Sequence, residues 1–553
     1  MSKDHDDNDL HRNGELPEDP FKGDEWEDRK PVPRAPPVGV ENHTRATRAA
    51  HLILDRVCEL FRTSKGVPYA VHPVGEHREC HPVRGHAFRT WAAGIVFEAE
   101  GKAIAGSSLA DALEVVAARA LYESPMCEVF VRVAAHDGRW YIDLADADWR
   151  AVEVSPDGWR VVDEPPVRFQ RKPGALPLPD PVRGGSVAEL RPLVNVADED
   201  WPLLLTWLVA ALSPIGPYPV LALFGEQGSA KSTTARVCRR LVDPNEASLR
   251  SEPREVRDLM IAANNGHVIV LDNVSALSAW LSDALCRLAT GSGFAVRTNY
   301  SDDEETILTA RLPVIVTAIE HVVVRSDLLD RALVLTCPTI PPTRRRTERE
   351  HEAEFAKAAP RVFGALLDAL SVALRRIPET RLENLPRMAD FATLAVAAES
   401  ALGLEAGAVL RALDASRADA RGAILDASPI AGPIRALVET DPWEGTAREL
   451  LDKLNERVPE PDRKSRSWPK TPKALADQVR RIAPDLRAVG VNVELWRAPG
   501  GRRDRMLSLG GPPTGTQPGR TRDAASNVDS PENKGFGSHG THGTQVSLLG
   551  SDA

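Results

Sequence analysis

Short, uninterrupted apolar runs mark the middle of the chain. They occupy residues 219–224, 266–272 and 312–317. Runs of this length without polar interruptions are typical of parallel strands buried on both faces. Stretches compatible with helices follow the first two runs, at residues 233–241 and 278–289. Residues 186–340 are therefore predicted to form a parallel β-sheet covered by helices, an α/β fold.

The pattern before this region is mixed and predicts an α+β domain over residues 44–185. Apolar positions at helical spacing predict helices at residues 44–61 and 109–121, with Ser107 or Ser108 as the cap of the second. Short runs separated by Asp-Gly pairs predict an antiparallel meander. Its strands are expected at residues 129–133, 140–144 and 152–154. The pattern does not indicate a function for this domain.

Histidine and cysteine residues gather near the start of the same domain. They are His72, His77, Cys80, His81 and His86. Their spacing matches no familiar arrangement of zinc ligands. A polar loop without a metal ion is the preferred interpretation.

After the predicted sheet, the pattern becomes helical at residues 341–427 and then changes again. Residues 428–510 read as three helices followed by two strands, at residues 491–496 and 505–509. A capping box at Thr446–Glu449 and a Thr471-Pro472 pair open the second and third helices. This order predicts a winged helix. The terminal segments, residues 1–43 and 511–553, are predicted to be disordered.

The distribution of charge along the chain indicates DNA as a candidate partner. The formal net charge is −10, yet residues 463–505 hold twelve Lys or Arg against four Asp or Glu. Such a basic patch is typical of surfaces that bind the phosphates of DNA. The candidate contacts are Lys473, Arg480 and Arg481 on the third helix and Arg502 and Arg503 in the wing. The alternative is a solvated basic surface that contacts the acidic N-terminal tail.

The expected compartment is the cytoplasm. The six cysteines are scattered without a CxxC pair, and no secretory signal is recognisable, so a disulfide framework is not expected. The longest apolar stretch, residues 201–212, is too short to cross a bilayer. No membrane association is predicted.

A glycine loop lies between the first apolar run and the helix that follows it. The predicted nucleotide-binding residues are Gly225, Glu226, Gln227, Gly228, Ser229, Ala230, Lys231, Ser232 and Thr233. Strand, glycine loop and helix in this order form a P-loop, in which backbone N–H groups and the helix dipole hold phosphate. Lys231 is expected to reach the β- and γ-phosphates of ATP, and Ser232 to ligate Mg²⁺. Ala230 replaces the usual glycine, which is tolerated if its φ is negative.

The other two runs end in polar residues that complete the predicted site. Asp272 is expected at the carboxyl end of a neighbouring strand, where it would hold the same Mg²⁺. Thr317 ends the third run and could contact the γ-phosphate or the attacking water. Asn273 occupies the place where many P-loop ATPases carry a water-activating glutamate, which puts hydrolysis rather than binding in doubt. Glu226 and the acidic run at residues 302–305 are the candidate substitutes.

The segment at residues 290–300, TGSGFAVRTNY, carries a glycine turn followed by basic and aromatic residues. Together with the order and spacing of the motifs above, it resembles the hairpin region of phage- or prophage-type superfamily 3 helicases of the AAA+ class. The resemblance implies that Arg297 and Tyr300 line a DNA path and that Thr317 is a sensor residue. It also implies that Arg325 and Arg331 reach a neighbouring subunit's nucleotide. For both arginines, an ion pair with Asp327 or Asp330 is the alternative.

The predicted function is that of an ATP-dependent DNA helicase or translocase in the replication of a phage or other mobile element. It would act as a homo-oligomeric ring with DNA, ATP, Mg²⁺ and possible replication proteins as partners. The alternative is a nucleotide-gated DNA-binding switch or helicase loader with little hydrolysis, which Asn273 favours. A nuclease or primase activity on residues 44–185 has no acidic motif to support it.

Overall fold

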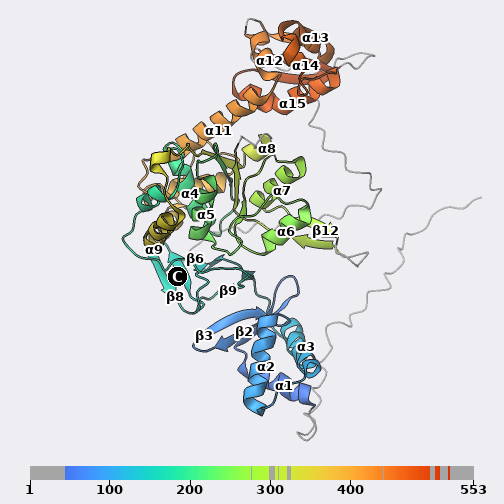
Figure 1. Ribbon diagram of the computed structural model, residues 1–553. Coiled ribbons are helices and arrows are strands. Elements are labelled where there is room, and N and C mark those ends of the chain that lie inside the picture. Colours follow the sequence, from blue (N-terminus) through green and yellow to red (C-terminus); the bar gives the residue numbers. More distant parts are fainter. Residues whose placement is uncertain are drawn as a thin grey trace, which may run out of the picture. The chain divides into compact units, whose positions relative to one another are not determined.

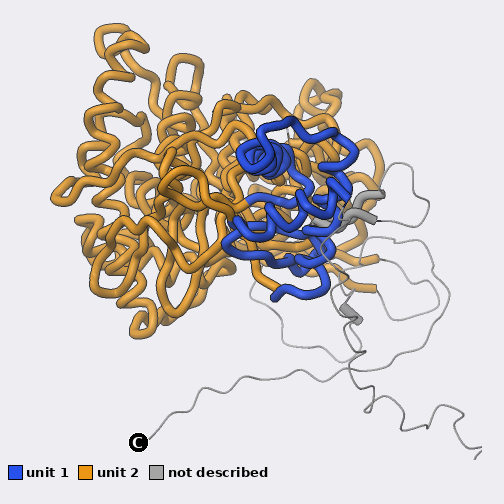
Figure 2. Tube along the Cα trace, turned by 90° about the horizontal axis from the view of Figure 1, so that it is seen from below, with its two compact units in different colours: residues 1–71, 81–125 blue, residues 72–80, 126–553 orange. Residues whose placement is uncertain are grey.

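The computed structural model describes residues 44–275, 277–297, 305–308, 310–319, 326–439, 441–497, 505–510 and 521–522 (Figure 1). Contacts divide the chain into two compact units (Figure 2). The first comprises residues 1–71 and 81–125, and the second comprises residues 72–80 and 126–553. The sequence analysis placed the whole of residues 44–185 in one domain, whereas the structure assigns residues 126–185 to the same unit as the parallel sheet.

The first unit packs three helices around one core. These are α1 (Arg45–Arg56), α2 (His86–Glu100) and α3 (Gly106–Tyr122), and their buried core includes Ile53, Phe88 and Val116. The helix predicted over residues 44–61 ends at Arg56, and β1 (Glu59–Arg62) follows. β1 pairs with the strand beginning at Pro68, so sheet hydrogen bonding overrides the helical spacing. The predicted Ser caps of α3 are also wrong, because Ala105 is its N-cap.

The histidine-bearing segment is a β-hairpin and not the predicted loop. β2 (Pro68–Val74) and β3 (His77–Pro82) are neighbours in a sheet of order β1-β2-β3. Gly75 and Glu76 connect them, and Gly75 has φ +57. A positive φ is inexpensive for glycine, which explains the tight turn.

The predicted antiparallel meander is present, but its first strand begins at Val133 and not at residue 129, and it has a fourth strand. It consists of β5 (Val133–His136), β6 (Arg139–Asp143), β7 (Ala151–Ser155) and β8 (Gly158–Val162), antiparallel and in sequence order. Two short strands, β4 (Val129–Phe130) and β9 (Arg168–Phe169), pair beside it. Asp137 and Gly138 both have positive φ, as a two-residue hairpin turn requires. Trp140, Ile142 and Val154 of the meander join the main hydrophobic core of the unit.

The predicted parallel sheet is present with one additional strand. Its strands are β10 (Val220–Phe224), β11 (Ile269–Leu271), β14 (Val314–Ala318) and β15 (Ala332–Thr336), in the order β11-β14-β10-β15. All three pairings are parallel. β15 was not predicted, and β14 lies between the two strands that the sequence analysis treated as neighbours.

Helices cover both faces of this sheet. Leu221 and Leu223 pack into a core with α4 (Trp201–Ala211), α5 (Lys231–Val242), α9 (Glu348–Arg376) and α10 (Ala389–Ala398). Val220, Ala222 and Phe224 belong to a second core with α6 (Val256–Asn264), α7 (Ala279–Thr290) and α8 (Ser326–Leu329). The alternation of side chains along β10 therefore supplies both cores.

Further elements belong to this region of the chain. They are η1 (Val187–Leu193), η2 (Pro342–Arg344), α11 (Ala408–Ala427) and the antiparallel pair β12 (Phe294–Arg297) and β13 (Glu305–Leu308). Only β12 of this pair lies in residues 290–300, the segment that resembles a helicase hairpin, and β13 follows it.

The C-terminal module has the predicted three helices and two strands. They are α12 (Ala431–Val438), α13 (Ala447–Arg457), α15 (Pro472–Ala488), β17 (Val493–Arg497) and β18 (Arg505–Leu509). Both predicted caps are confirmed, since Thr446 and Glu449 form a capping box and Thr471 caps α15 ahead of Pro472. The elements not predicted are β16 (Trp443–Thr446), α14 (Glu460–Lys464) and β19 (Thr521–Arg522), and the sheet order is β16-β18-β17-β19.

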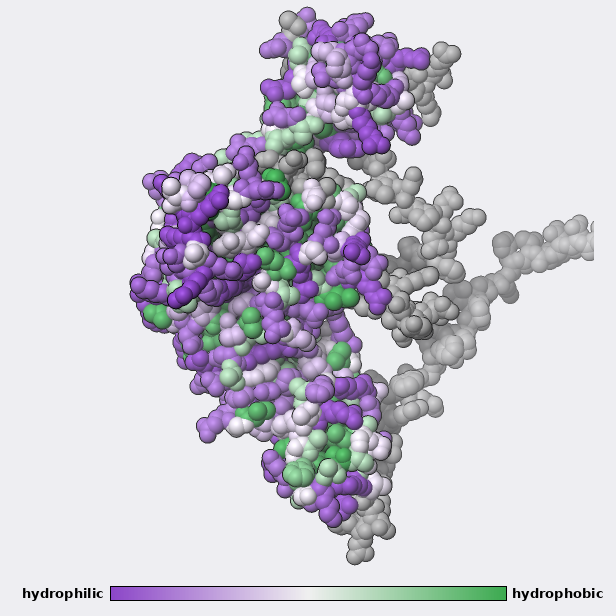
Figure 3. All heavy atoms as spheres, in the orientation of Figure 1, coloured by the Kyte–Doolittle hydropathy of each residue, from purple (hydrophilic) through white to green (hydrophobic). Residues whose placement is uncertain are grey.

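The surface is mainly hydrophilic on the face shown in Figure 3. Within the described part of the chain, every helix is too short or too polar to cross a lipid bilayer.

A buried acid links the start of α4 to the end of β15. The Asp200 carboxylate accepts a hydrogen bond of 2.7 Å from the Thr336 amide, and burial raises the pKa of Asp200 to about 6. Because this value exceeds that of an unfolded aspartate, about 4, the folded state loses stability as the pH rises from 4 through 6.

Replacing Asp200 by asparagine should therefore stabilise the protein more at pH 7.5 than at pH 4.5. The amide keeps an acceptor for Thr336 and carries no charge to desolvate, so a gain of about 2 kcal/mol is expected at the higher pH. Thermal unfolding of Asp200→Asn and wild type at both pH values measures the difference. Equal shifts in Tm at the two values would contradict the assignment.

Candidate functional site

The loop from Gly225 to Ser232 connects β10 to α5 at the carboxyl edge of the parallel sheet. Its backbone requires glycine at two positions. A Cβ on Gly225 would lie 2.3 Å from the carbonyl oxygen of Cys337, and Gly228 has φ +81. Nη2 of Arg345 lies only 3.5 Å from the place where a Cβ of Gly228 would stand. The loop is thus folded tightly against the segment that follows β15.

Ala230 adopts a backbone conformation that the sequence analysis did not expect. It is the N-cap of α5 with φ +55 and ψ 29, in the left-handed region, so the condition of a negative φ, under which alanine would be tolerated here, is not met. The tight return from the loop into α5 imposes this conformation. For an alanine it costs about 1–2 kcal/mol.

Ala230→Gly should consequently stabilise the protein, by about 1 kcal/mol. Glycine adopts the left-handed region without steric cost, although it also gains freedom in the unfolded chain. The shift in thermal unfolding temperature measures the effect. Ala235→Gly in the interior of α5 is the matched control and should have the opposite sign, since it replaces a buried helical alanine. A Tm at or below that of wild type for Ala230→Gly would contradict the prediction.

Lys231 is the first residue of α5, and its ammonium group lies over the loop. Nζ donates hydrogen bonds of 2.7 Å to the carbonyl oxygens of Gly225 and Glu226. It also lies 3.3 Å from Oγ of Ser229. The carboxylate of Glu226 accepts a hydrogen bond from the Thr339 hydroxyl, at 3.3 Å. Lys231 is therefore placed where an anion entering the loop would meet its charge.

Two hydroxyl side chains from different elements converge on one carboxylate oxygen beside the loop. Oδ1 of Asp272 accepts hydrogen bonds of 2.7 Å from the Ser232 hydroxyl and 2.6 Å from the Thr317 hydroxyl. Asp272 follows β11, Ser232 lies in the first turn of α5, and Thr317 lies in β14. Because β14 separates β10 from β11, Thr317 bridges the gap between them. The sequence analysis had expected Asp272 on a strand adjacent to the loop strand, which is wrong.

This junction has the right donors for a hard divalent cation. A hydroxyl and a carboxylate supply oxygen ligands, which Mg²⁺ prefers, and Mg²⁺ usually keeps several waters besides. Asn273 follows directly with φ +56, and its amide donates to Oγ1 of Thr317 at 2.9 Å. Thr317 is therefore held by both Asp272 and the backbone of Asn273.

A large basic cavity opens beside the start of α5, and the sequence analysis missed it. Its volume is about 1050 Å³, and Ala230 and Thr233 belong to its wall. The charged part of its lining consists of three acids, Asp198, Glu348 and Glu352, and six arginines, Arg191, Arg236, Arg240, Arg344, Arg345 and Arg346. The run Arg344–Arg346 lies just beyond β15, so identifying that strand would have drawn attention to it.

Asn195 is a second residue that the sequence analysis missed. Its Nδ2 donates to the carbonyl oxygens of Ser229 (2.9 Å) and Pro338 (2.5 Å), and its amide donates to Oγ1 of Thr234 (3.1 Å). One side chain thus ties the loop to the segment after β15. No sequence pattern signals an isolated asparagine of this kind.

Of the two predicted arginines after β14, the structure describes Arg331. Arg331 forms an ion pair with Asp327, the alternative that the sequence analysis had named. Burial alone would raise the pKa of Asp327, but the hydrogen bond and charge of Arg331 lower it. Arg325 and the acidic residues 302–304 lie outside the described residues.

The predicted DNA contacts fall into two regions. Arg297 is the last residue of β12 and lies opposite Glu305 of β13 in the strand register. Tyr300 lies outside the described residues. Lys473, Arg480 and Arg481 lie on α15 and are exposed. Lys473 and Arg480 line a cavity of about 220 Å³ with Trp496 and Arg505 of the adjacent strands. Arg502 and Arg503 are not among the described residues.

Two family models match the chain. The model described as actinomycete integrative conjugative element replication protein matches residues 187–420. The model described as AICE RepA C-terminal domain matches residues 430–522. The two matches together span more than half of the chain. No curated protein matches it.

Solved structures give weaker similarities. One is titled "SCCmec type IV Cch - active helicase"; it is 12% identical with a TM-score of 0.43, and the match covers 82% of this chain and 92% of that chain. Another is titled "The apo structure of NrS-1 C terminal region (305-718)"; it is 13% identical with a TM-score of 0.39 and coverages of 85% and 100%. Overlap at this level does not establish a common fold.

Proposed function

We propose that this chain, which belongs to the replication proteins of actinomycete integrative conjugative elements, is an ATP-driven motor that acts on the element's DNA. The observation that carries the proposal is the junction of Ser232, Asp272 and Thr317 beside the ammonium group of Lys231. Replication requires strand separation or movement along DNA, and a nucleotide site of this composition could supply the energy.

The residues around the loop each have a part in this proposal. Lys231 would exchange its two carbonyl partners for phosphate oxygens, which are stronger acceptors because they are charged. Ser232 and Asp272 would hold Mg²⁺, which shields the phosphates during hydrolysis. The dipole of α5 adds a partial positive charge at the loop. Arg345, near Gly228 on the wall of the basic cavity, is a further cation available to the same nucleotide.

Thr317 is our candidate for the contact with the attacking water. Its hydroxyl lies 2.6 Å from the Asp272 carboxylate and is fixed from behind by the Asn273 amide. A fixed hydroxyl can orient a water molecule, but it is not a base, so we expect slow turnover in the absence of DNA. A homo-oligomeric ring would let Arg325 act across an interface, whereas Arg331 would first have to leave Asp327.

The test is phosphate release by the full-length protein without DNA, with single-stranded DNA and with duplex DNA. We expect release to require Mg²⁺ and to increase when DNA is present. Strand displacement on a forked duplex then separates a helicase from a translocase. Nucleotide binding without any turnover would favour the second candidate, a nucleotide-gated switch or helicase loader, which the asparagine at position 273 supports.

DNA binding by the C-terminal module, which we propose is a winged helix, has its own test. Arg480 and Arg481 are exposed on α15, and Arg480 pairs only with Asp477 on the same helix among the ion pairs described. Replacing both by alanine should lower DNA affinity similarly for all DNA sequences. It should also reduce the slope of log K against log salt concentration by about two, because each phosphate contact releases about one counter-ion.

The control for this variant also removes two positive charges, but from other helices. Arg411 on α11 and Arg435 on α12 are exposed, and their double alanine variant should leave the salt dependence unchanged. Fluorescence anisotropy over a range of salt concentrations measures both. An unchanged slope for the Arg480/Arg481 variant would remove α15 from the DNA-binding surface.

A further inference from the structure

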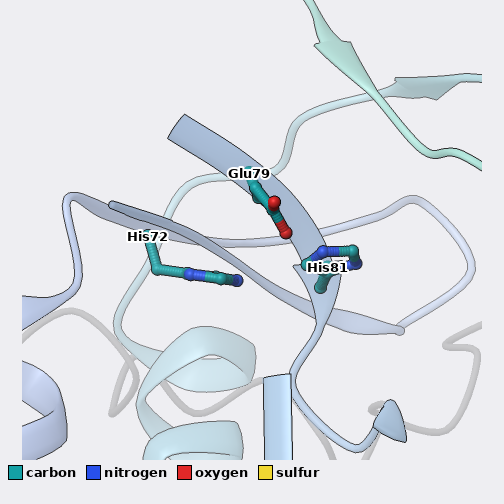
Figure 4. Close-up of side chains that lie close together, drawn as sticks. All are labelled: His72, Glu79 and His81. Carbon is teal, nitrogen blue, oxygen red and sulfur yellow. The ribbon is translucent and has the colours of Figure 1, made fainter. Parts of the chain in front are cut away.

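Three potential metal ligands meet on the β2–β3 hairpin. His72 lies on β2, and Glu79 and His81 lie on β3. One ligand atom of each side chain lies within 4.8 Å of those of the other two (Figure 4). The hairpin consists of consecutive residues 68–82, so its own two strands and turn set this arrangement.

The periodicity of a strand explains why these side chains converge. Side chains two residues apart on a strand point to the same face, which places Glu79 and His81 together. β2 is the neighbouring strand in the sheet and brings His72 next to them. The prediction from sequence considered only histidine and cysteine residues and the familiar spacings of zinc ligands. Glu79 was therefore not among the candidates.

We propose that His72, Glu79 and His81 bind one divalent transition-metal ion of the zinc class. Two imidazole nitrogens and one carboxylate oxygen suit zinc and its neighbours, whereas Mg²⁺ and Ca²⁺ prefer sites made only of oxygen. Three protein ligands leave a fourth tetrahedral position for water or another ligand. Four-coordinate zinc bound in this way would fix the two strands of the hairpin to each other.

Burial and the outer contacts agree with such a site. His72 is 1% exposed, while Glu79 and His81 are partly exposed, so an ion can enter from the side of β3. Nε2 of His77 lies 3.2 Å from Oε1 of Glu79. Partners of this kind orient a ligating carboxylate and tune the affinity of a metal site. The proposed site does not depend on the proposed ATPase activity.

The test is zinc binding by the full-length protein after treatment with a chelator and without nucleotide. His539 and His542 near the C-terminus could bind zinc independently, so both are replaced by asparagine in the background protein. We expect one equivalent of Zn²⁺, retained in competition with a chromogenic chelator and in millimolar Mg²⁺. Co²⁺ in its place should give the visible absorption of a four-coordinate ion with nitrogen and oxygen ligands.

Substitutions of the partly exposed ligands identify the site. Glu79→Gln and His81→Asn should each weaken Zn²⁺ binding at least about 100-fold, since even outer contacts contribute 10–100-fold. His86→Asn, at the exposed start of α2, is the matched control and should bind as the background does. Circular dichroism verifies that each variant is folded. Absence of the bound equivalent, or equal affinity in all variants, would overturn the proposal.

Discussion

Replacement of Lys231 by alanine should lower ATP turnover by at least about 10²-fold, the cost of removing one fixed donor from a developing charge. Nζ of Lys231 lies 2.7 Å from two loop carbonyl oxygens, so the ammonium group is already in place before nucleotide arrives. Little reorganisation is then required when phosphate replaces those carbonyls. Phosphate release at saturating ATP, with and without single-stranded DNA, measures the loss.

A lysine elsewhere on the protein provides the comparison. Lys357 on α9 is exposed, and Lys357→Ala should turn over ATP as the wild type does. Nucleotide affinity of the Lys231 variant distinguishes the two candidate functions. Weakened binding together with lost turnover supports a motor, and weakened binding in a protein that never hydrolysed ATP supports a switch. Unchanged binding and turnover would show that the loop is not the nucleotide site.

The sequence predicted the central elements of this site because their signals are local. An apolar run, two glycines and a lysine at the start of a helix lie within thirteen residues, and the backbone at Gly225 and Gly228 demands glycine. The positions of Asp272 and Thr317 followed from a simple rule, that the ends of parallel strands share one edge of the sheet. Their hydrogen bonds to each other could not be predicted, because the strand order is a tertiary property.

The site residues that the sequence did not indicate contact partners that are far away along the chain. Asn195 joins Ser229 to Pro338, and each of these partners is far away along the chain. Arg345 reaches the loop only because β15 pairs with β10 and returns the chain to its side. Likewise, residues 57–61 continue the helical spacing of α1, yet β1 pairs with β2 instead. The spacing of apolar residues within one segment cannot show that a neighbouring strand will pair with that segment.

The second large effect concerns stability. Asp243, which caps the C-terminal end of α5, lies in a buried ionic cluster. Its carboxylate accepts a hydrogen bond of 3.0 Å from Nε of Arg132 and bonds of 2.8 and 3.0 Å from the amides of His267 and Val268. Burial would raise the pKa of Asp243, but the charge of Arg132 and these bonds lower it. The acid is therefore ionised in the folded protein.

Asp243→Ala should cost about 3–5 kcal/mol, because it leaves the Arg132 guanidinium buried without its counter-ion and two amides without an acceptor. The side chain of Arg132 is only 2% exposed, so water cannot replace the carboxylate without local opening. For a unit of this size the expected fall in Tm is about 5 °C. Differential scanning calorimetry measures it.

Removing the charge from both partners should be less damaging than removing the acid alone. In Arg132→Met with Asp243→Asn, the Arg132 charge is removed together with the acid, and the asparagine oxygen still accepts from the backbone amides. The buried Arg239 guanidinium, which also faces Asp243, keeps its charge in both variants, so the comparison isolates the effect of Arg132. This double variant should recover part of the loss in Tm. If it were as unstable as Asp243→Ala, burial of the unpaired guanidinium would not be the cause.

The cluster also links stability to the nucleotide site. α5 begins at Lys231 and ends at the Asp243 cap, and Nε of Arg239 in the same helix donates to the Asp243 carbonyl. Arg132, just before β5, anchors the meander to this end of the helix. Loss of Asp243 should therefore loosen the helix that carries Lys231 and Ser232. We expect Asp243→Ala to lose nucleotide affinity at temperatures well below its Tm, whereas the Arg132→Met and Asp243→Asn double variant should retain most of it.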